Sequence, residues 1–209
     1  MQLADPQQAQ LLEIFEKGAA RSAEKLTSLS GMPWNIHIVS LDVGSGGRFR
    51  SILARDKGDC LGIVFSNPGE RYMVLFSEES GRALVEASYP ARGGKRRLLP
   101  SMEQSALAEI ANVLVNGLSG EMADRHGMFR CLTAPTVATG RKVAVFEQAF
   151  GAFVGDDAMV DVLIHISSPQ LAADCTVMLR LDGLNANFLL NTDPDALSAY
   201  LPAGSDLSA

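Results

Sequence analysis

Apolar residues recur with the period of an α-helix in two long segments of the chain, and shorter β-type runs lie between them. From about residue 6 to residue 29 the apolar and small residues fall on one side of a helix, and Gly31 and Pro33 end it. A second helix is expected from about residue 101 to 123. Residues 34–43 alternate in part and are rich in β-branched side chains, which predicts a strand.

A β-hairpin is predicted soon after this strand. Residues 59–66 and 71–77 are apolar runs on either side of the turn signal NPGE, and the short helix SGRALVEA follows. Residues 174–197 repeat this order, because both segments begin with Asp-Cys and read as strand, turn, strand and short helix. The hairpins are offset by about 115 residues and the long helices by about 96, so roughly 19 additional residues are expected before the second hairpin.

These elements predict an α+β fold built from two duplicated α-β-β-α halves, about residues 6–90 and 101–203, in one domain over residues 1–209. Their strands would merge into one antiparallel sheet with the long helices packed against it. The additional residues contain KVAVFEQAFGAFV, which periodicity leaves ambiguous between helix and strand, and the apolar run MVDVLIHIS.

Composition and charge exclude several classes of protein. The 209 residues are 47% hydrophobic and carry a net charge of −6, which argues against a surface for nucleic acid. The N-terminus has no basic and apolar leader, and the apolar runs are far shorter than the ~20 residues of a membrane-spanning helix. We therefore expect a cytoplasmic protein without membrane insertion.

The cysteines and histidines do not form a recognisable site. Cys60, Cys131 and Cys175 are widely spaced, and buried free thiols are expected. The three histidines lack metal-ligand spacing, so no metal site of the protein's own is expected.

The second predicted helix carries an unusual polar stripe. At 100° per residue, four polar side chains lie within about 60° of one another, opposite the apolar side of the helix: Ser105, Glu109, Asn112 and Asn116. Asparagine is a weak helix former, so something other than helix stability could select these residues. On spacing alone, the simpler interpretation is that both asparagines are tolerated surface positions.

The pattern Ser105-x3-Glu109-x2-Asn112, followed after 22 intervening residues by Pro135, resembles the signature of the CheC/CheX/FliY phosphatases. These enzymes act on the phosphorylated chemotaxis response regulator CheY. The surrounding segments SALAEIANVLVNGL and PTVATG also resemble the family. With the repeated halves, the resemblance extends over most of the chain and is weakest over residues 142–167.

The resemblance implies hydrolysis of an aspartyl phosphate in chemotaxis or two-component signalling. Asn112 would hold the attacking water, and Glu109 would pair with a lysine of the phosphorylated CheY-like receiver domain. Ser105 and Pro135 would support the motif, and Asn116 could contact the partner. No cofactor of the chain's own is implied, because the regulator supplies Mg²⁺.

The first half departs from the signature. Positions 96 residues earlier hold Ala9, Glu13, Glu16 and Val39. The water-holding amide is therefore replaced by Glu16, whose charge repels a phosphoryl group. We expect a degenerate first site and one active helix. The simpler interpretation of Glu13 and Glu16 is a solvated helix face, and a paired-carboxylate hydrolase is a remote alternative.

The sequence is also compatible with other partners and functions. Lys95, Arg96 and Arg97 could steer docking of an acidic receiver, or could belong to a solvated loop. Some relatives bind the deamidase CheD, and some form homodimers through their sheets. The alternative function is a non-catalytic adaptor that binds a response regulator, or a flagellar switch-type scaffold. A nucleotide-dependent enzyme is less favoured, because GSGG lacks the arrangement of a phosphate-binding loop.

Overall fold

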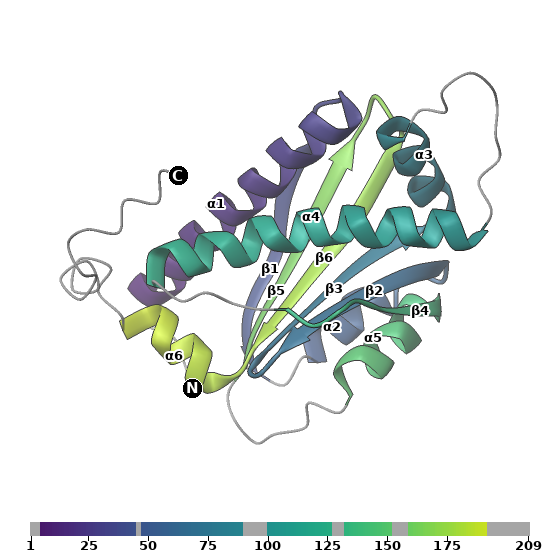
Figure 1. Ribbon diagram of the computed structural model, residues 1–209. Helices are drawn as coiled ribbons and strands as arrows, with labels where there is room; N and C mark the ends of the chain where they lie inside the picture. Colours follow the sequence, from purple (N-terminus) through teal and green to yellow (C-terminus); the bar gives the residue numbers. More distant parts are fainter. Residues whose placement is uncertain (1–4, 45–46, 90–99, 127–131, 152–158, 192–209) are drawn as a thin grey trace.

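A six-stranded antiparallel sheet lies between two layers of helices in the computed structural model of the chain (Figure 1). The structure describes residues 5–44, 47–89, 100–126, 132–151 and 159–191. The strand order is β1-β5-β6-β3-β2-β4. The predicted fold class is confirmed: an α+β protein with one antiparallel sheet against which the long helices pack.

The same order of elements occurs twice along the chain. The first half comprises α1 (Asp5–Ser30), β1 (Asn35–Gly44), α2 (Gly47–Leu53), β2 (Asp59–Asn67), β3 (Glu70–Ser77) and α3 (Glu78–Ser88). The second half comprises α4 (Pro100–His126), β4 (Thr136–Arg141), α5 (Lys142–Phe150), β5 (Met159–Ser168), β6 (Ala173–Leu181) and α6 (Gly183–Asn191). Each half therefore has one strand and one short helix more than the α-β-β-α unit expected.

The two halves exchange their first strands. β1 pairs with β5 of the second half, and β4 pairs with β2 of the first half. The hairpins β2–β3 and β5–β6 meet in the middle, where β3 pairs with β6. The predicted end of the second half, near residue 203, lies outside the described residues.

The expectation for residues 174–197 is wrong. Asp174 lies in β6, whose counterpart in the first half is β3 rather than β2, and the residues after β6 form α6 instead of a second strand. Asp182 accepts a hydrogen bond from the backbone N–H of Asn185 (2.8 Å), so the segment DGLN begins a helix and is not a hairpin turn. The apolar run MVDVLIHIS is β5, and KVAVFEQAF is helix α5. The long helices begin 95 residues apart and the hairpins 100 residues apart, so the expected insertion of roughly 19 residues before the second hairpin is wrong.

The two faces of the sheet bury separate apolar clusters. α1, α3, α4 and α6 cover one face, and α2 and α5 cover the other (Figure 1). Nearly every position of β5 is buried because helices lie on both sides, whereas the edge strand β4 is mostly exposed. Cys60 and Cys175 are free and buried, as expected, and Cys131 lies outside the described residues. Burial raises the pKa of the Cys60 thiol to about 11.

A buried ion pair supports the layer formed by α5. Arg180 donates to both carboxylate oxygens of Asp161 (2.6 and 2.9 Å), and neither residue is more than 4% exposed. The Arg180 guanidinium also lies 5.7 and 5.1 Å from the ring centroids of Phe146 and Phe150 in α5. Burial raises the pKa of Asp161, although Arg180 acts in the opposite direction.

Helices α1 and α4 approach each other closely at small residues. The Ser22 hydroxyl oxygen lies within hydrogen-bond distance of two carbonyl oxygens, Leu114 of α4 (2.7 Å) and Gly18 of α1 (3.0 Å). A Cβ atom at Gly117 would lie 2.8 Å from Ser22 N and 2.9 Å from Ser22 Cα. A Cβ at Gly18 would lie 3.0 Å from Leu118 Cα. The crossing therefore fixes the rotation of α4 about its own axis.

Within the described residues, no helix is long and apolar enough to cross a membrane.

Gly117→Ala should destabilise the protein, although alanine normally stabilises a helix relative to glycine. The added methyl group meets the α1 backbone, and we expect a loss of about 1–3 kcal/mol in the free energy of unfolding. Gly120→Ala is the matched control, because nothing lies within 4 Å of a Cβ there, and it should stabilise by up to about 1 kcal/mol. Urea denaturation of both variants measures the difference. A gain in stability for both variants would contradict the close crossing.

Candidate functional site

An exposed ridge runs along α4 on the side opposite its buried face. We define the α4 ridge as Ser105, Glu109, Asn112 and Asn116. Three of these side chains are exposed, and Asn112 is partly buried. The opposite side of α4 contains residues that are at most 7% exposed: Leu107, Ile110, Ala111, Leu114 and Leu118. The outward orientation predicted from the 3.6-residue period is therefore found in the structure.

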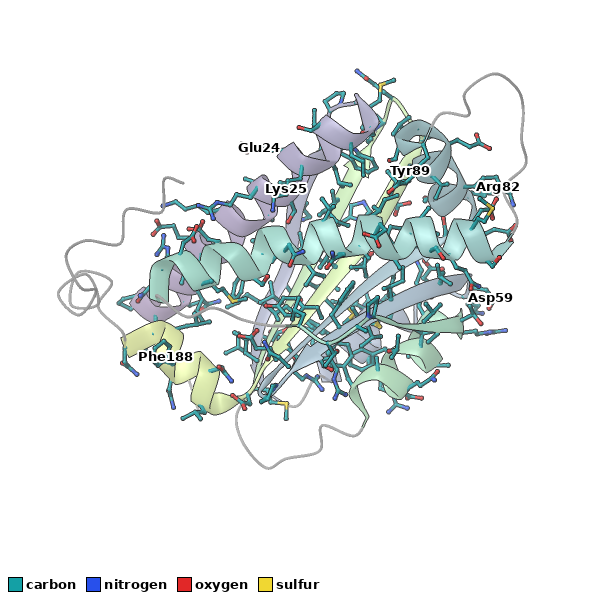
Figure 2. The ribbon with its side chains drawn as sticks, in the orientation of Figure 1. Glu24, Lys25, Asp59, Arg82, Tyr89 and Phe188 are labelled. Carbon is teal, nitrogen blue, oxygen red and sulfur yellow. The ribbon has the colours of Figure 1, made fainter. Side chains whose placement is uncertain are left out.

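Helix α4, which carries the ridge, crosses the front of the molecule in Figure 1, with α3 near one of its ends and α6 near the other. Figure 2 labels one side chain near each end of α4 in this view: Arg82 of α3 lies toward its N-terminal end, and Phe188 of α6 lies toward its C-terminal end. The middle of α4 carries Glu109, Asn112 and Asn116. A partner protein could therefore approach these three side chains from solvent.

Hydrogen bonds distinguish the four ridge residues. Asn116 Nδ2 donates to Asn112 Oδ1 (3.2 Å), one helical turn apart. The Ser105 hydroxyl donates to the Ser101 carbonyl oxygen (2.9 Å), so it is engaged by its own helix. Among the described residues, Glu109 has no hydrogen-bond or ion-pair partner. The ridge thus presents an unpaired carboxylate one turn from a pair of neutral amides.

Pro135 lies in the segment that leads into β4 and is exposed. Thr133 N donates to the Ser66 carbonyl oxygen (2.9 Å), which holds this segment along the end of β2. Proline has no N–H to donate, and regular pairing with β2 begins at the next residue, Thr136, opposite Val64. Pro135 takes no part in the hydrogen bonds of the α4 ridge.

No protein-family model and no curated protein matches the sequence. Solved structures match the fold. Thermotoga maritima FliY is 12% identical with a TM-score of 0.66, and the match covers 90% of this chain and 96% of that chain. The Helicobacter pylori FliM middle domain is 13% identical with a TM-score of 0.58, covering 90% and 98%. A putative chemotaxis protein from Desulfovibrio vulgaris Hildenborough is 14% identical with a TM-score of 0.51, covering 80% and 95%.

The chain has the CheC/CheX/FliY fold. Ser105, Glu109 and Asn112 of the signature-like pattern lie on α4, one of the two long helices of this CheC-like fold, whereas Pro135 lies just before β4. The other long helix, α1, holds the corresponding positions of the first half. The two helices present different side chains to a partner.

The α1 positions differ from the α4 ridge in charge and in pairing. Glu13 Oε1 accepts hydrogen bonds from Lys17 Nζ (2.8 Å) and from Arg125 Nη2 of α4 (2.8 Å). Hydrogen bonds from Lys17 and Arg125 hold the pKa of Glu13 below its usual value. Glu16 is exposed and supplies a carboxylate in place of the ridge amide. Glu13 is therefore already engaged within the molecule, whereas Glu109 is not.

Sequence reasoning missed two features of the site. The first is the hydrogen bond between Asn116 and Asn112, for which the i, i+4 spacing was an available signal. The second is the pairing of Arg125 with Glu13, which has no sequence signal because 112 residues separate them.

The expected contact residues Lys95, Arg96 and Arg97 lie outside the described residues. In the described part of the chain, no group of three His, Cys, Asp or Glu residues could hold a metal ion.

A cluster of charges joins α1 to α4 away from the ridge. The Glu121 side chain is 8% exposed and forms ion pairs with Arg21 Nε of α1 (3.1 Å) and with Arg125 Nε (3.4 Å). Arg21 also pairs with Asp124, and this hydrogen bond raises its pKa. Together with the glycine crossing, these contacts hold α1 against α4.

Glu121→Ala should lower the free energy of unfolding by about 1–3 kcal/mol, because it leaves Arg21 and the partly buried Arg125 without this carboxylate. Urea denaturation measures the change. Glu16→Ala is the matched control on α1 and should change stability by less than about 0.5 kcal/mol, because Glu16 is exposed. Equal changes in the free energy of unfolding for the two substitutions would contradict a stabilising role for Glu121 between α1 and α4.

Proposed function

We propose that this chain is a protein phosphatase that hydrolyses the aspartyl phosphate of a CheY-like response regulator, with α4 as its one active helix. The observation that carries the proposal is the α4 ridge. Its unpaired Glu109 carboxylate and neutral Asn112 amide occupy the positions of the family signature and face solvent on the CheC/CheX/FliY fold.

Hydrolysis of an aspartyl phosphate needs an attacking water in line with the bond that breaks. The water oxygen bonds to phosphorus, the bond from phosphorus to the aspartyl oxygen breaks, and the products are inorganic phosphate and a free carboxylate. Catalysis depends mainly on positioning and on neutralising the phosphoryl oxygens. The partner's Mg²⁺ and lysine supply positive charge at the phosphoryl group.

Asn112 is suited to hold that water. A carboxamide can accept a hydrogen bond at Oδ1 and donate one from Nδ2, so one side chain contacts both the water and an anionic acceptor. It carries no charge, and a phosphoryl group therefore approaches it without the repulsion that a carboxylate at this position would cause. The Asn112 side chain is partly buried, which limits the rotamers that it can adopt.

Glu109 is suited to docking. Its carboxylate is exposed and has no partner among the described residues, so a cation on the receiver does not have to displace an internal ion pair. Glu109 lies three residues before Asn112, on the same side of α4. A pair between Glu109 and the receiver's lysine would orient the helix across the phosphorylation site.

A second function uses the same surface without hydrolysis. The FliM middle domain has this fold, and one matched H. pylori structure is a FliG–FliM complex. These likenesses support a response-regulator-binding adaptor or a flagellar switch-type scaffold. The amide at Asn112 favours the phosphatase, because docking alone does not require a group that holds water.

Asn112→Ala should reduce the rate of phosphate release from a phosphorylated receiver by about 10²-fold, because the attacking water loses its positioning group. Glu109→Ala should mainly raise KM, because it removes a docking contact. Phosphate release is measured at several concentrations of receiver, with Glu16→Ala as the matched control. If wild type and both variants release phosphate equally fast, the phosphatase assignment is wrong. If wild type binds the phosphorylated receiver without speeding phosphate loss, the adaptor is favoured.

Restoring an amide on α1 should not create a second active helix. In an Asn112→Ala background, Glu16→Asn supplies the missing amide, but Glu13 stays paired with Lys17 and Arg125. We expect phosphate release within about twofold of the Asn112→Ala variant alone, because α1 still lacks a docking carboxylate. A recovery to near the wild-type rate would show that Glu13 is available to a partner after all.

A further inference from the structure

We propose that Asn116 is a positioning residue that fixes the orientation of the Asn112 carboxamide. The inference rests on the proposed phosphatase function of the α4 ridge and adds a residue outside its signature. The observation behind it is the hydrogen bond from Asn116 Nδ2 to Asn112 Oδ1, 3.2 Å long and one helical turn away.

The two ends of a carboxamide are nearly equal in size but opposite in hydrogen bonding. Rotation of the amide by about 180° exchanges an acceptor oxygen for a donor nitrogen. In the structure Asn116 turns its NH₂ group toward Asn112, and because this group can only donate, Asn112 Oδ1 faces it. With Asn116 in this orientation, the Asn112 amide is held in one of its two orientations before any partner arrives.

This orientation leaves the chemistry of Asn112 available. Oδ1 has two lone pairs, and Asn116 uses one of them, so the other can accept an O–H of the attacking water. Nδ2 has no protein acceptor among the described residues and can donate to an oxygen of the partner's acyl phosphate. Donation from Asn116 to Oδ1 also polarises the amide, which makes Nδ2 a better donor.

The pair is specific to the proposed active helix. The position that corresponds to Asn116 on α1, 96 residues earlier, is Ala20, and the position that corresponds to Asn112 is Glu16. Two asparagines on an exposed helix face form a less stable helix than alanine would, so helix stability does not account for them. A role in orienting Asn112 does.

The test compares three variants of Asn116 with Asn112→Ala and one control variant for release of phosphate from a phosphorylated CheY-like receiver, with kcat and KM determined separately. Asn116→Ala removes the donor and should lower kcat about fivefold, the effect of losing one neutral hydrogen bond, with KM unchanged within about twofold. Asn116→Leu has a similar size but can neither donate nor accept a hydrogen bond and adds no charge, so its kcat should fall about as far as that of Asn116→Ala. Asn116→Gln keeps a donor amide and should recover kcat to within about twofold of wild type.

Asn191→Ala is the control variant, and three outcomes of the assay would contradict the proposal. Asn191→Ala removes another exposed asparagine that donates to a residue one turn earlier, the Asn187 carbonyl oxygen in α6 (2.9 Å), and should leave kcat unchanged. A rise in KM with unchanged kcat for Asn116→Ala would make Asn116 a partner contact and overturn the proposal. Wild-type kcat in the alanine and leucine variants of Asn116, with Asn112→Ala about 10²-fold slower, would overturn it while leaving the phosphatase function intact. Full activity of Asn112→Ala in the same assay would overturn both.

Discussion

The close crossing of α1 and α4 is the constraint on which the candidate site depends. Gly117 and Ser22 bring the two helix backbones into contact, and burial of the leucine-rich side of α4 then leaves one rotation for the helix. In that rotation the α4 ridge faces solvent. A helix held by a looser contact could turn by tens of degrees, and the ridge residues would no longer share one accessible line.

Two related helices in the fold have taken different roles through their ion pairs. On α1, Glu13 is paired with Lys17 and with Arg125, which comes from the opposite helix. On α4, Glu109 has no such partner among the described residues. A carboxylate that already has two cations nearby gains little from a third, so Glu13 is less available to an external cation than Glu109.

Local signals in the sequence predicted the helices and the orientation of the site. Periodicity and helix-breaking residues placed α1 and α4 within a few residues of their observed bounds, and the same periodicity placed Glu109 and Asn112 opposite the core. Non-local features were not predictable in this way. The pairing of β1 with β5 and the contact of Arg125 with Glu13 join residues more than 100 positions apart. The segment at Asp182 was misinterpreted because the same residue types begin helices and form turns.

The exchange of β1 and β4 between the halves has a consequence for how the chain folds as it is made. Among the described strands, β1 pairs with β5 alone, and β5 is synthesised more than a hundred residues after β1. The first half therefore cannot complete its strand pairing until β4 and β5 have left the ribosome, and β1 stays unpaired until then. Such non-local pairing slows folding and lengthens the time during which strand edges can aggregate. Temporary protection of the nascent first half would therefore raise the yield of native protein.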